Sequence, residues 1–287
     1  MKETDKEKNW DLVIRSKTPF LRLGLKELYR YRDLVMLFAK RDIVAQYKQT
    51  LLGPTWLLIQ PILSTIFNTI IFGTLAKFDT KGIPYPVFIL SGLTAWNFFA
   101  SAFNKTSGIF ITNASIFGKV YFPRLTVPLA SIISNFITFI IQFALLLCLL
   151  LFYKFQNGYD WEINYKWLLA LPLLLGAISL LGLGAGLVIS SLTTKYRDLT
   201  FLTGFIMQFL MYFSSVAFPI NSFGSKWEIF FKLNPILHLV SLFRAIVINA
   251  PLPDVMWLAY SIVSTLIILI IGILIFNKVE KSFMDTV

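Results

Sequence analysis

Residues 29–61 read YRYRDLVMLFAKRDIVAQYKQTLLGPTWLLIQP, and this stretch decides the fold because a charged amphipathic segment turns into a membrane-length apolar run. The sequence before it is polar, and the sequence after it alternates between apolar runs and short basic loops. At 3.6 residues per turn the segment has an apolar face and a cationic face, formed by Met36, Ala39, Ile43, Tyr47 and Leu51 and by Arg30, Arg41 and Lys48. Such a helix suits the plane of a membrane interface, although an ordinary surface helix with no further role has the same periodicity.

The composition places the chain in the membrane class. Of its 287 residues, 56% are hydrophobic, 16% are aromatic and only 14% are charged. The 26 Lys and Arg exceed the 15 Asp and Glu, but they gather in loops, so nucleic-acid binding is not indicated. Cys148 is the only cysteine and lies within an apolar run, which leaves neither a disulfide framework nor a thiolate metal site.

Six apolar runs are long enough for a bilayer core, which needs roughly 20 residues per helix. They are Thr55–Ala76, Pro86–Thr106, Leu125–Phe152, Leu168–Leu192, Thr200–Phe218 and Val255–Phe276. The fold class is therefore an all-α integral membrane protein with six transmembrane helices. We expect three parts: a cytoplasmic N-terminal segment at 1–53, a six-span domain at 54–278 and a short tail at 279–287.

The distribution of Lys and Arg predicts the orientation. With the N-terminus inside, the inner segments hold 19 of these residues and the outer segments hold 7. Because inner loops are enriched in Lys and Arg, both termini are expected in the cytoplasm.

The segment 219–253, between the fifth and sixth spans, is too apolar for a solvated loop and too broken for a span. Two apolar stretches flank Asn234-Pro235, and Arg244 lies within the second. Stretches of about 10–14 residues favour re-entrant or interfacial helices. We expect two half-helices that dip back from the outer face. An amphipathic helix on the outer surface remains the alternative.

The sequence offers few residues for a nucleotide, metal or catalytic site, and the surrounding sequence argues against most of them. The run from Gly182 to Gly186 has no preceding strand, so small residues for close helix packing explain it better than a dinucleotide site. The sequence contains no phosphate-cradling G-x-x-x-x-G-K-[ST]. His238 is the only histidine, which makes a metal site improbable. The predicted span interiors lack Asp and Glu, which disfavours ion-coupled transport, and no catalytic residues are indicated.

What remains is a membrane pathway with polar and aromatic side chains and no energy source of its own. Aromatic faces and amide groups suit weak contact with a passing sugar chain, although packing explains many of the same residues. The channel-lining candidates are Gln60, Asn68, Trp96, Phe98, Phe99 and Tyr212.

An ordered set of short motifs resembles the permease subunits of ABC-type polysaccharide exporters, the O-antigen and teichoic-acid group. The motifs are Lys40-Arg41-Asp42-Ile43 with Tyr47, Gly53, Trp56 and Pro61, then Phe117-Gly118-Lys119 with Phe122-Pro123, Tyr196-Arg197-Asp198, Pro219 and Asn234-Pro235. The resemblance covers nearly the whole chain.

The resemblance implies a homodimer with a channel at its two-fold axis and two cytoplasmic ABC ATPase subunits. The chain itself would carry no cofactor, with ATP and Mg²⁺ on the ATPase, and would sit in the bacterial inner membrane. The helix at 34–52 would be a gate that admits a lipid-linked glycan, whose pyrophosphate meets Arg30, Lys40, Arg41, Tyr47 and Lys48. Segment 107–119 would couple to the ATPase, through Asn113, Ser115, Phe117 and Lys119. Segment 227–248 would form the outer gate, with Trp227, Pro235 and His238 as its candidate residues.

Three alternatives stay open at this stage. A drug, haem or teichoic-acid exporter of the same superfamily is the nearest. A membrane-embedded glycan or acyl transferase and a scaffold subunit belong to other classes. Turnover of a lipid-linked donor by the chain alone would indicate the transferase, and intact glycan export after its loss would indicate the scaffold.

Overall fold

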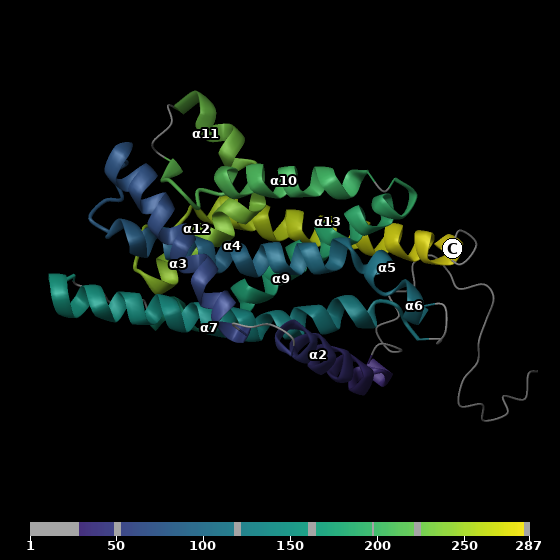
Figure 1. Ribbon diagram of the computed structural model, residues 1–287. Coiled ribbons are helices and arrows are strands. Elements are labelled where there is room, and N and C mark those ends of the chain that lie inside the picture. The colour runs from purple at the N-terminus through teal and green to yellow at the C-terminus, as the bar shows by residue number, and fades with distance from the viewer. Residues whose placement is uncertain are drawn as a thin grey trace, which may run out of the picture.

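A computed structural model describes residues 29–48, 53–117, 122–159, 165–196, 198–220 and 225–283, and every regular element in these ranges is helical. Figure 1 shows α4, α7, α9, α10 and α13 running side by side in a bundle, with α3 crossing them obliquely. The predicted all-α membrane class is confirmed. Tyr47 is described only as backbone, and Lys119 and the predicted tail from 284 onward lie outside the described residues.

Five helical segments within the described ranges are long and apolar enough to cross a bilayer. The first is α3 (Trp56–Asn68) with its π-helical continuation η2 (Thr69–Leu75), and the others are α4 (Tyr85–Ser107), α7 (Thr126–Asn157), α9 (Leu171–Lys195), which the short α8 (Tyr165–Leu168) precedes, and α13 (Val255–Phe283). They correspond to the first, second, third, fourth and sixth predicted spans.

The fifth predicted span, Thr200–Phe218, is shorter in the structure. Helix α10 (Leu199–Phe213) has 15 residues, a length of about 22 Å at 1.5 Å per residue. It ends at a turn in which Ser215 has a φ of 55° and its hydroxyl donates to the Phe218 carbonyl at 2.7 Å. A bilayer core is about 30 Å thick, so α10 by itself does not establish a sixth span.

Helix α9 lies at the centre, pressed between α4 and α13. A Cβ added at Gly182 would lie 2.8 Å from the Phe99 carbonyl oxygen, and one at Gly184 would lie 2.7 Å from the Leu269 Cα. Distances below 3.0 Å do not occur between real Cβ atoms and their neighbours. The glycines therefore let three backbones approach closely, which confirms the packing role that the sequence predicts.

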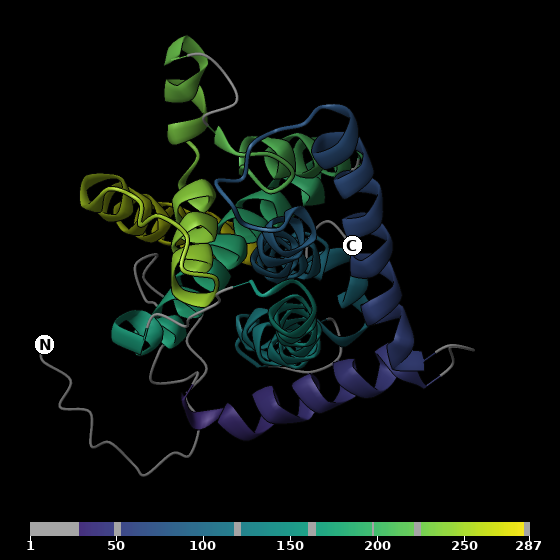
Figure 2. The same ribbon diagram turned by 90° about the vertical axis from the view of Figure 1, so that its left-hand side faces the viewer.

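Helix α2 (Arg32–Tyr47) runs across the bundle instead of along it, as the end-on view in Figure 2 shows. It packs on α7 and buries Val35, Phe38 and Ala39. Met36, expected on the same face as Ala39, is 60% exposed instead. The predicted apolar face is therefore rotated. The helix has apolar residues on two sides, and the sequence pattern does not show which side meets the bundle.

Two short helices replace a spanning element after α10, as predicted for 219–253. These are α11 (Ser225–Lys232) and α12 (Pro235–Val247). The Asn234 side chain accepts a hydrogen bond from the Ile236 backbone N–H at 3.3 Å, so it caps α12, and Pro235 fits the first turn, where no N–H is needed. Helix α12 is almost completely buried, whereas Trp227 on α11 is 63% exposed.

The bundle thus has two distinct ends. At the α12 end lie α12 and the loop 76–84 between η2 and α4. At the α2 end lie α2 and the one-turn helices α5 (Ile109–Thr112) and α6 (Ala114–Phe117), visible at the right of Figure 1.

Candidate functional site

The α2 end brings together two segments that the sequence assigns to different tasks. The Arg41 guanidinium donates to Asp42 Oδ1 from Nε at 3.0 Å and from Nη2 at 2.7 Å. The same Nη2 donates to Asn113 Oδ1 at 3.4 Å, between α5 and α6. Arg41 therefore joins the predicted gate helix to the predicted coupling segment.

Further contacts hold α2 in place beside that bond. The Phe38 ring lies 5.5 Å from the Phe122 ring, centroid to centroid, and the Arg41 guanidinium carbon lies 4.8 Å from the Phe38 centroid. Asp42 also interacts electrostatically with Lys105 of α4. The charge of Arg41 is thus neutralised by Asp42 on the same helix, and Asn113 and Lys105 add polar contacts from outside α2.

The remaining cations of the predicted gate helix lie on α2 or beside its two ends. Arg30, Lys40 and Lys48 are all exposed. A phosphate group that approached α2 from the membrane interface would meet these charges first. The side chain of Tyr47 is outside the described residues, so its assigned role stays a prediction.

The predicted coupling residues divide between buried and exposed positions. Asn113 and Phe117 are buried, and Phe117 lies between the rings of Phe110 and Phe122, at 6.0 and 5.8 Å. Ser115 is exposed. The surface available to a partner also includes Ile111, which is 56% exposed and which the sequence analysis did not select. The sequence analysis missed Ile111 because a helix of one turn is too short to show a periodic pattern of apolar residues.

The channel-lining candidates occupy different environments. Trp96, Phe98 and Phe99 are buried in the core of this one chain, at 3–4% exposure. Gln60 is exposed on α3, and the Asn68 amide donates within its own helix to the Ser64 carbonyl at 2.7 Å. The channel assignment stays a prediction. Core packing already accounts for the three aromatic residues.

A polar seam between α4 and α7 is a feature that the sequence analysis did not select. Three side-chain hydrogen bonds follow one another along it: Asn97 to Gln142 at 3.2 Å, Ser101 to Asn135 at 2.7 Å and Lys105 to Ser134 at 2.9 Å. On α4 the three residues are four apart, about one helical turn, and this is the sequence signal of the seam; on α7 Gln142 lies seven residues from Asn135, and Ser134 is adjacent to Asn135. The seam fixes the relative rotation of α4 and α7.

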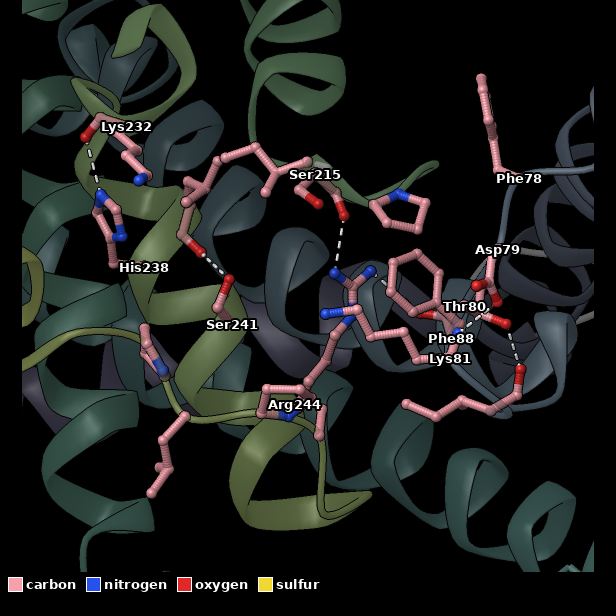
Figure 3. Close-up of a pocket in the computed structure, with 18 of the residues that line it drawn as sticks. Phe78, Asp79, Thr80, Lys81, Phe88, Ser215, Lys232, His238, Ser241 and Arg244 are labelled. Carbon is pink, nitrogen blue, oxygen red and sulfur yellow. Dashed lines mark hydrogen bonds between the residues drawn. The ribbon is translucent and has the colours of Figure 1, made fainter. Parts of the chain in front are cut away.

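The α12 end contains a pocket of about 580 Å³, drawn in Figure 3. The loop 77–83, the turn after α10, helix α12 and the segment 250–254 line it. Two of the predicted outer-gate residues are next to it or in it: Pro235 starts α12, and His238 is a lining residue. The His238 ring stacks on Trp257 at 5.4 Å, and its Nε2 lies 2.8 Å from the Lys232 carbonyl oxygen. Trp227 is not among the lining residues.

Arg244 of α12 is a lining residue that is only 4% exposed. Its Nη1 donates to the Ser215 carbonyl at 2.7 Å, and its Nη2 donates to the Val216 and Phe88 carbonyls at 3.0 and 3.1 Å. Its guanidinium carbon lies 3.7 Å from the Phe88 ring centroid. Arg244 thereby ties together α12, α4 and the turn that ends α10. Among the described residues no three His, Cys, Asp or Glu are grouped so that they could hold a metal ion.

The chain matches the family model for the ABC-2 type transporter over residues 33–248. It is 22% identical over 253 residues to an O-antigen export system permease protein of Klebsiella pneumoniae, which covers 88% of this chain and 94% of that protein. It is likewise 22% identical over 266 residues to the Myxococcus xanthus protein of that name, covering 92% and 98% of the two chains.

A polysialic acid transport protein of Escherichia coli is 24% identical over 246 residues, which covers 86% of this chain and 93% of that protein. The family match spans all the elements from α2 to α12, including both ends of the bundle. The chain therefore belongs to the ABC-2 type transporter family of membrane proteins.

Proposed function

We propose that this chain is the channel-forming permease of an ATP-driven exporter that moves a lipid-linked polysaccharide, with O-antigen as the first candidate, across the bacterial inner membrane. The observation that carries the proposal is the similarity, along 86–92% of the chain, to proteins named for O-antigen export and polysialic acid transport. A polysaccharide is the cargo class that these names share.

The energy source would be a separate subunit. The sequence has no G-x-x-x-x-G-K-[ST] motif that could hold the phosphates of ATP. Two cytoplasmic ATPase subunits, carrying ATP and Mg²⁺, would act on a homodimer of this chain. Both termini would be cytoplasmic, and α5 and α6 would meet the ATPase with the exposed Ile111 and Ser115.

The contacts at the α2 end support a direct route from the ATPase to the gate. Asn113, between α5 and α6, accepts a hydrogen bond from Arg41 of α2 at 3.4 Å. A displacement of α5 and α6 by the ATPase would therefore act on α2 without an intermediate element. The exposed Lys40 and Lys48 would contact the pyrophosphate of the lipid carrier, since a diphosphate at a lipid interface requires cations.

The test is affinity purification of the tagged chain from its native host in a mild detergent, followed by mass spectrometry, together with surface-glycan staining of a deletion strain. We expect a stoichiometric ABC ATPase to co-purify and the surface glycan to disappear on deletion and return on complementation. A chain that purifies alone and turns over a lipid-linked donor would overturn the proposal in favour of a transferase. Unchanged surface glycan in the deletion strain would show that a surface polysaccharide is not the cargo.

A further inference from the structure

The α12-end pocket has an excess of positive charge that the proposed function does not use. Its lining includes four cationic side chains, Lys77, Lys81, Lys232 and Arg244, and two carboxylates, Asp79 and Asp254. Glu228, outside the lining, pairs with Lys232 at 2.8 Å. The other three cations have no ion pair with a carboxylate among the residues that the structure describes.

Arg244 is the buried member of this group. All three of its hydrogen-bond acceptors are neutral backbone carbonyls, so its charge has no counterion. Its Nε is buried and has no hydrogen-bond partner within the described ranges. A buried charge and an unused buried donor are both unfavourable unless a ligand completes them. Helix α12 contributes this charge to a pocket that is otherwise open to the surface.

Lys77 and Lys81 lie at the mouth of the pocket and are exposed. In the view of Figure 3, Lys81 lies toward Phe88 and Arg244, whereas Lys232 and His238 are on the opposite side. Long lysine side chains on an exposed loop can reach a ligand that Arg244 holds from below. The combination of one buried guanidinium with two exposed ammonium groups suits an anion with more than one negative charge.

We propose that the pocket at the α12 end binds a phosphate-bearing group, held by Arg244, Lys77 and Lys81. A volume of about 580 Å³ accommodates a phosphate or diphosphate together with the polar group that carries it. The pocket lies where α4 and α13 begin, which is the depth of lipid head groups if these helices span the bilayer. The phosphate could belong to a phospholipid head group or to a soluble diphosphate, and the experiment separates these sources.

The first arm measures binding of inorganic pyrophosphate to the full chain in dodecyl maltoside, an uncharged detergent, by isothermal titration calorimetry. We expect saturable binding that weakens about tenfold in the Lys77→Gln, Lys81→Gln double variant, because two charge-assisted contacts are lost. The matched control is Lys154→Gln with Lys166→Gln, which removes one exposed lysine from the C-terminal end of α7 and one from α8, neither of which is in the pocket lining. If a co-purified partner also bound pyrophosphate, it would add the same binding to every variant, so the difference between the pocket variant and the control would still report on the pocket.

Arg244→Lys is the second variant, since it keeps the buried cation and loses the planar fork. We expect at least a fivefold weaker affinity for pyrophosphate, with a thermal unfolding transition still present as evidence of folding. The Lys77→Gln, Lys81→Gln variant keeps the proposal testable if Arg244→Lys does not fold, because both lysines are exposed.

The second arm incubates the chain with vesicles of phosphatidylglycerol and uncharged glycolipid and counts retained lipid by native mass spectrometry. Retention that pyrophosphate displaces identifies a lipid head group as the source, and pyrophosphate binding without retention identifies a soluble phosphate. The proposal is wrong if neither probe binds, or if the Lys154→Gln, Lys166→Gln control weakens binding as much as the pocket variants do. Neither arm requires export, so its failure is distinct from failure of the proposed function.

Discussion

The two ends of the bundle place an arginine at a junction of helices in opposite ways. At the α2 end, Arg41 is partly exposed and pairs with Asp42, its neighbour in sequence, with a longer bond to Asn113. At the α12 end, Arg244 is buried and binds three backbone carbonyls from two other segments. An arginine neutralised by its neighbour can exchange partners at low cost, whereas one that satisfies buried carbonyls cannot. The comparison indicates a movable junction at the α2 end and a fixed one at the α12 end.

The strongest test of the fixed junction is Arg244→Met. The substitution removes the Arg244 donors from the buried Ser215 and Val216 carbonyls, whereas the Phe88 carbonyl keeps the Ser91 hydroxyl as a donor at 2.9 Å. Each buried carbonyl left without a donor costs about 1–3 kcal/mol. We expect the free energy of unfolding to fall by about 3 kcal/mol or more, measured from the unfolding midpoint in detergent. The control Arg32→Met, at a side chain that is 64% exposed, should leave the midpoint unchanged. Equal unfolding midpoints for the two variants would show that Arg244 does not form a fixed junction at the α12 end.

A second substitution probes the same junction without removing the charge. A methyl group at Gly92 would collide with the Arg244 guanidinium, which cannot retreat without losing its acceptors. Gly92→Ala should therefore destabilise the protein by about 1–3 kcal/mol. Gly176→Ala is the matched control, because nothing lies within 4 Å of the added Cβ. Alanine favours a helix interior over glycine by about 1 kcal/mol, so this control should raise the midpoint. A Gly92→Ala variant as stable as the control would show that Arg244 is free to move.

The movable junction is tested by Arg41→Gln combined with Lys48→Gln. We expect a small stability change, within about 1 kcal/mol, because partly exposed ion pairs contribute little. Export should nevertheless be lost, since these cations would carry the gate function, and surface-glycan staining measures it. Normal surface glycan in the double variant would contradict the gate assignment. A large loss of stability would instead show that the junction at the α2 end is as fixed as the one at the α12 end.

The smallest effect on stability is expected from Ile111→Ala with Ser115→Ala. Both side chains are exposed on α5 and α6, so their removal leaves the core intact. ATP hydrolysis by the partner should continue without stimulation by substrate, as measured in reconstituted vesicles. Phe117→Ala is the contrasting variant, because a buried phenylalanine contributes about 3–5 kcal/mol to folding. Coupling that survives the exposed pair would move the ATPase contact elsewhere.

Features that follow from local pattern were predictable from the sequence. Five spans and the break at Asn234-Pro235 follow from the length of apolar runs and from proline's preference for a first helical turn. The close packing through Gly182 follows from the spacing of small residues.

Features that depend on distant partners were not predictable. Met36 was assigned to the wrong face because α2 has apolar residues on two sides, so the sequence pattern does not show which side of the helix packs against the bundle. The early end of α10 coincides with a left-handed residue, Ser215, and the Ser214-Ser215 pair by itself does not specify that conformation in a run that is otherwise mostly apolar. The partners of Arg244 are carbonyls 28, 29 and 156 residues away, and carbonyls carry no sequence signal. Of the proposed site residues, the sequence thus finds the cations of α2 and misses Arg244.

The shortness of α10 has a consequence for the lipid around it. The helix presents Phe201, Phe205 and Phe209 outward at 79%, 65% and 65% exposure, so its apolar surface is about 22 Å long against a bilayer core of about 30 Å. Hydrophobic mismatch of this kind is relieved when the membrane thins beside the helix. Wherever α10 meets lipid, a polar head group moving between the leaflets would cross a shorter hydrocarbon layer than elsewhere in the membrane.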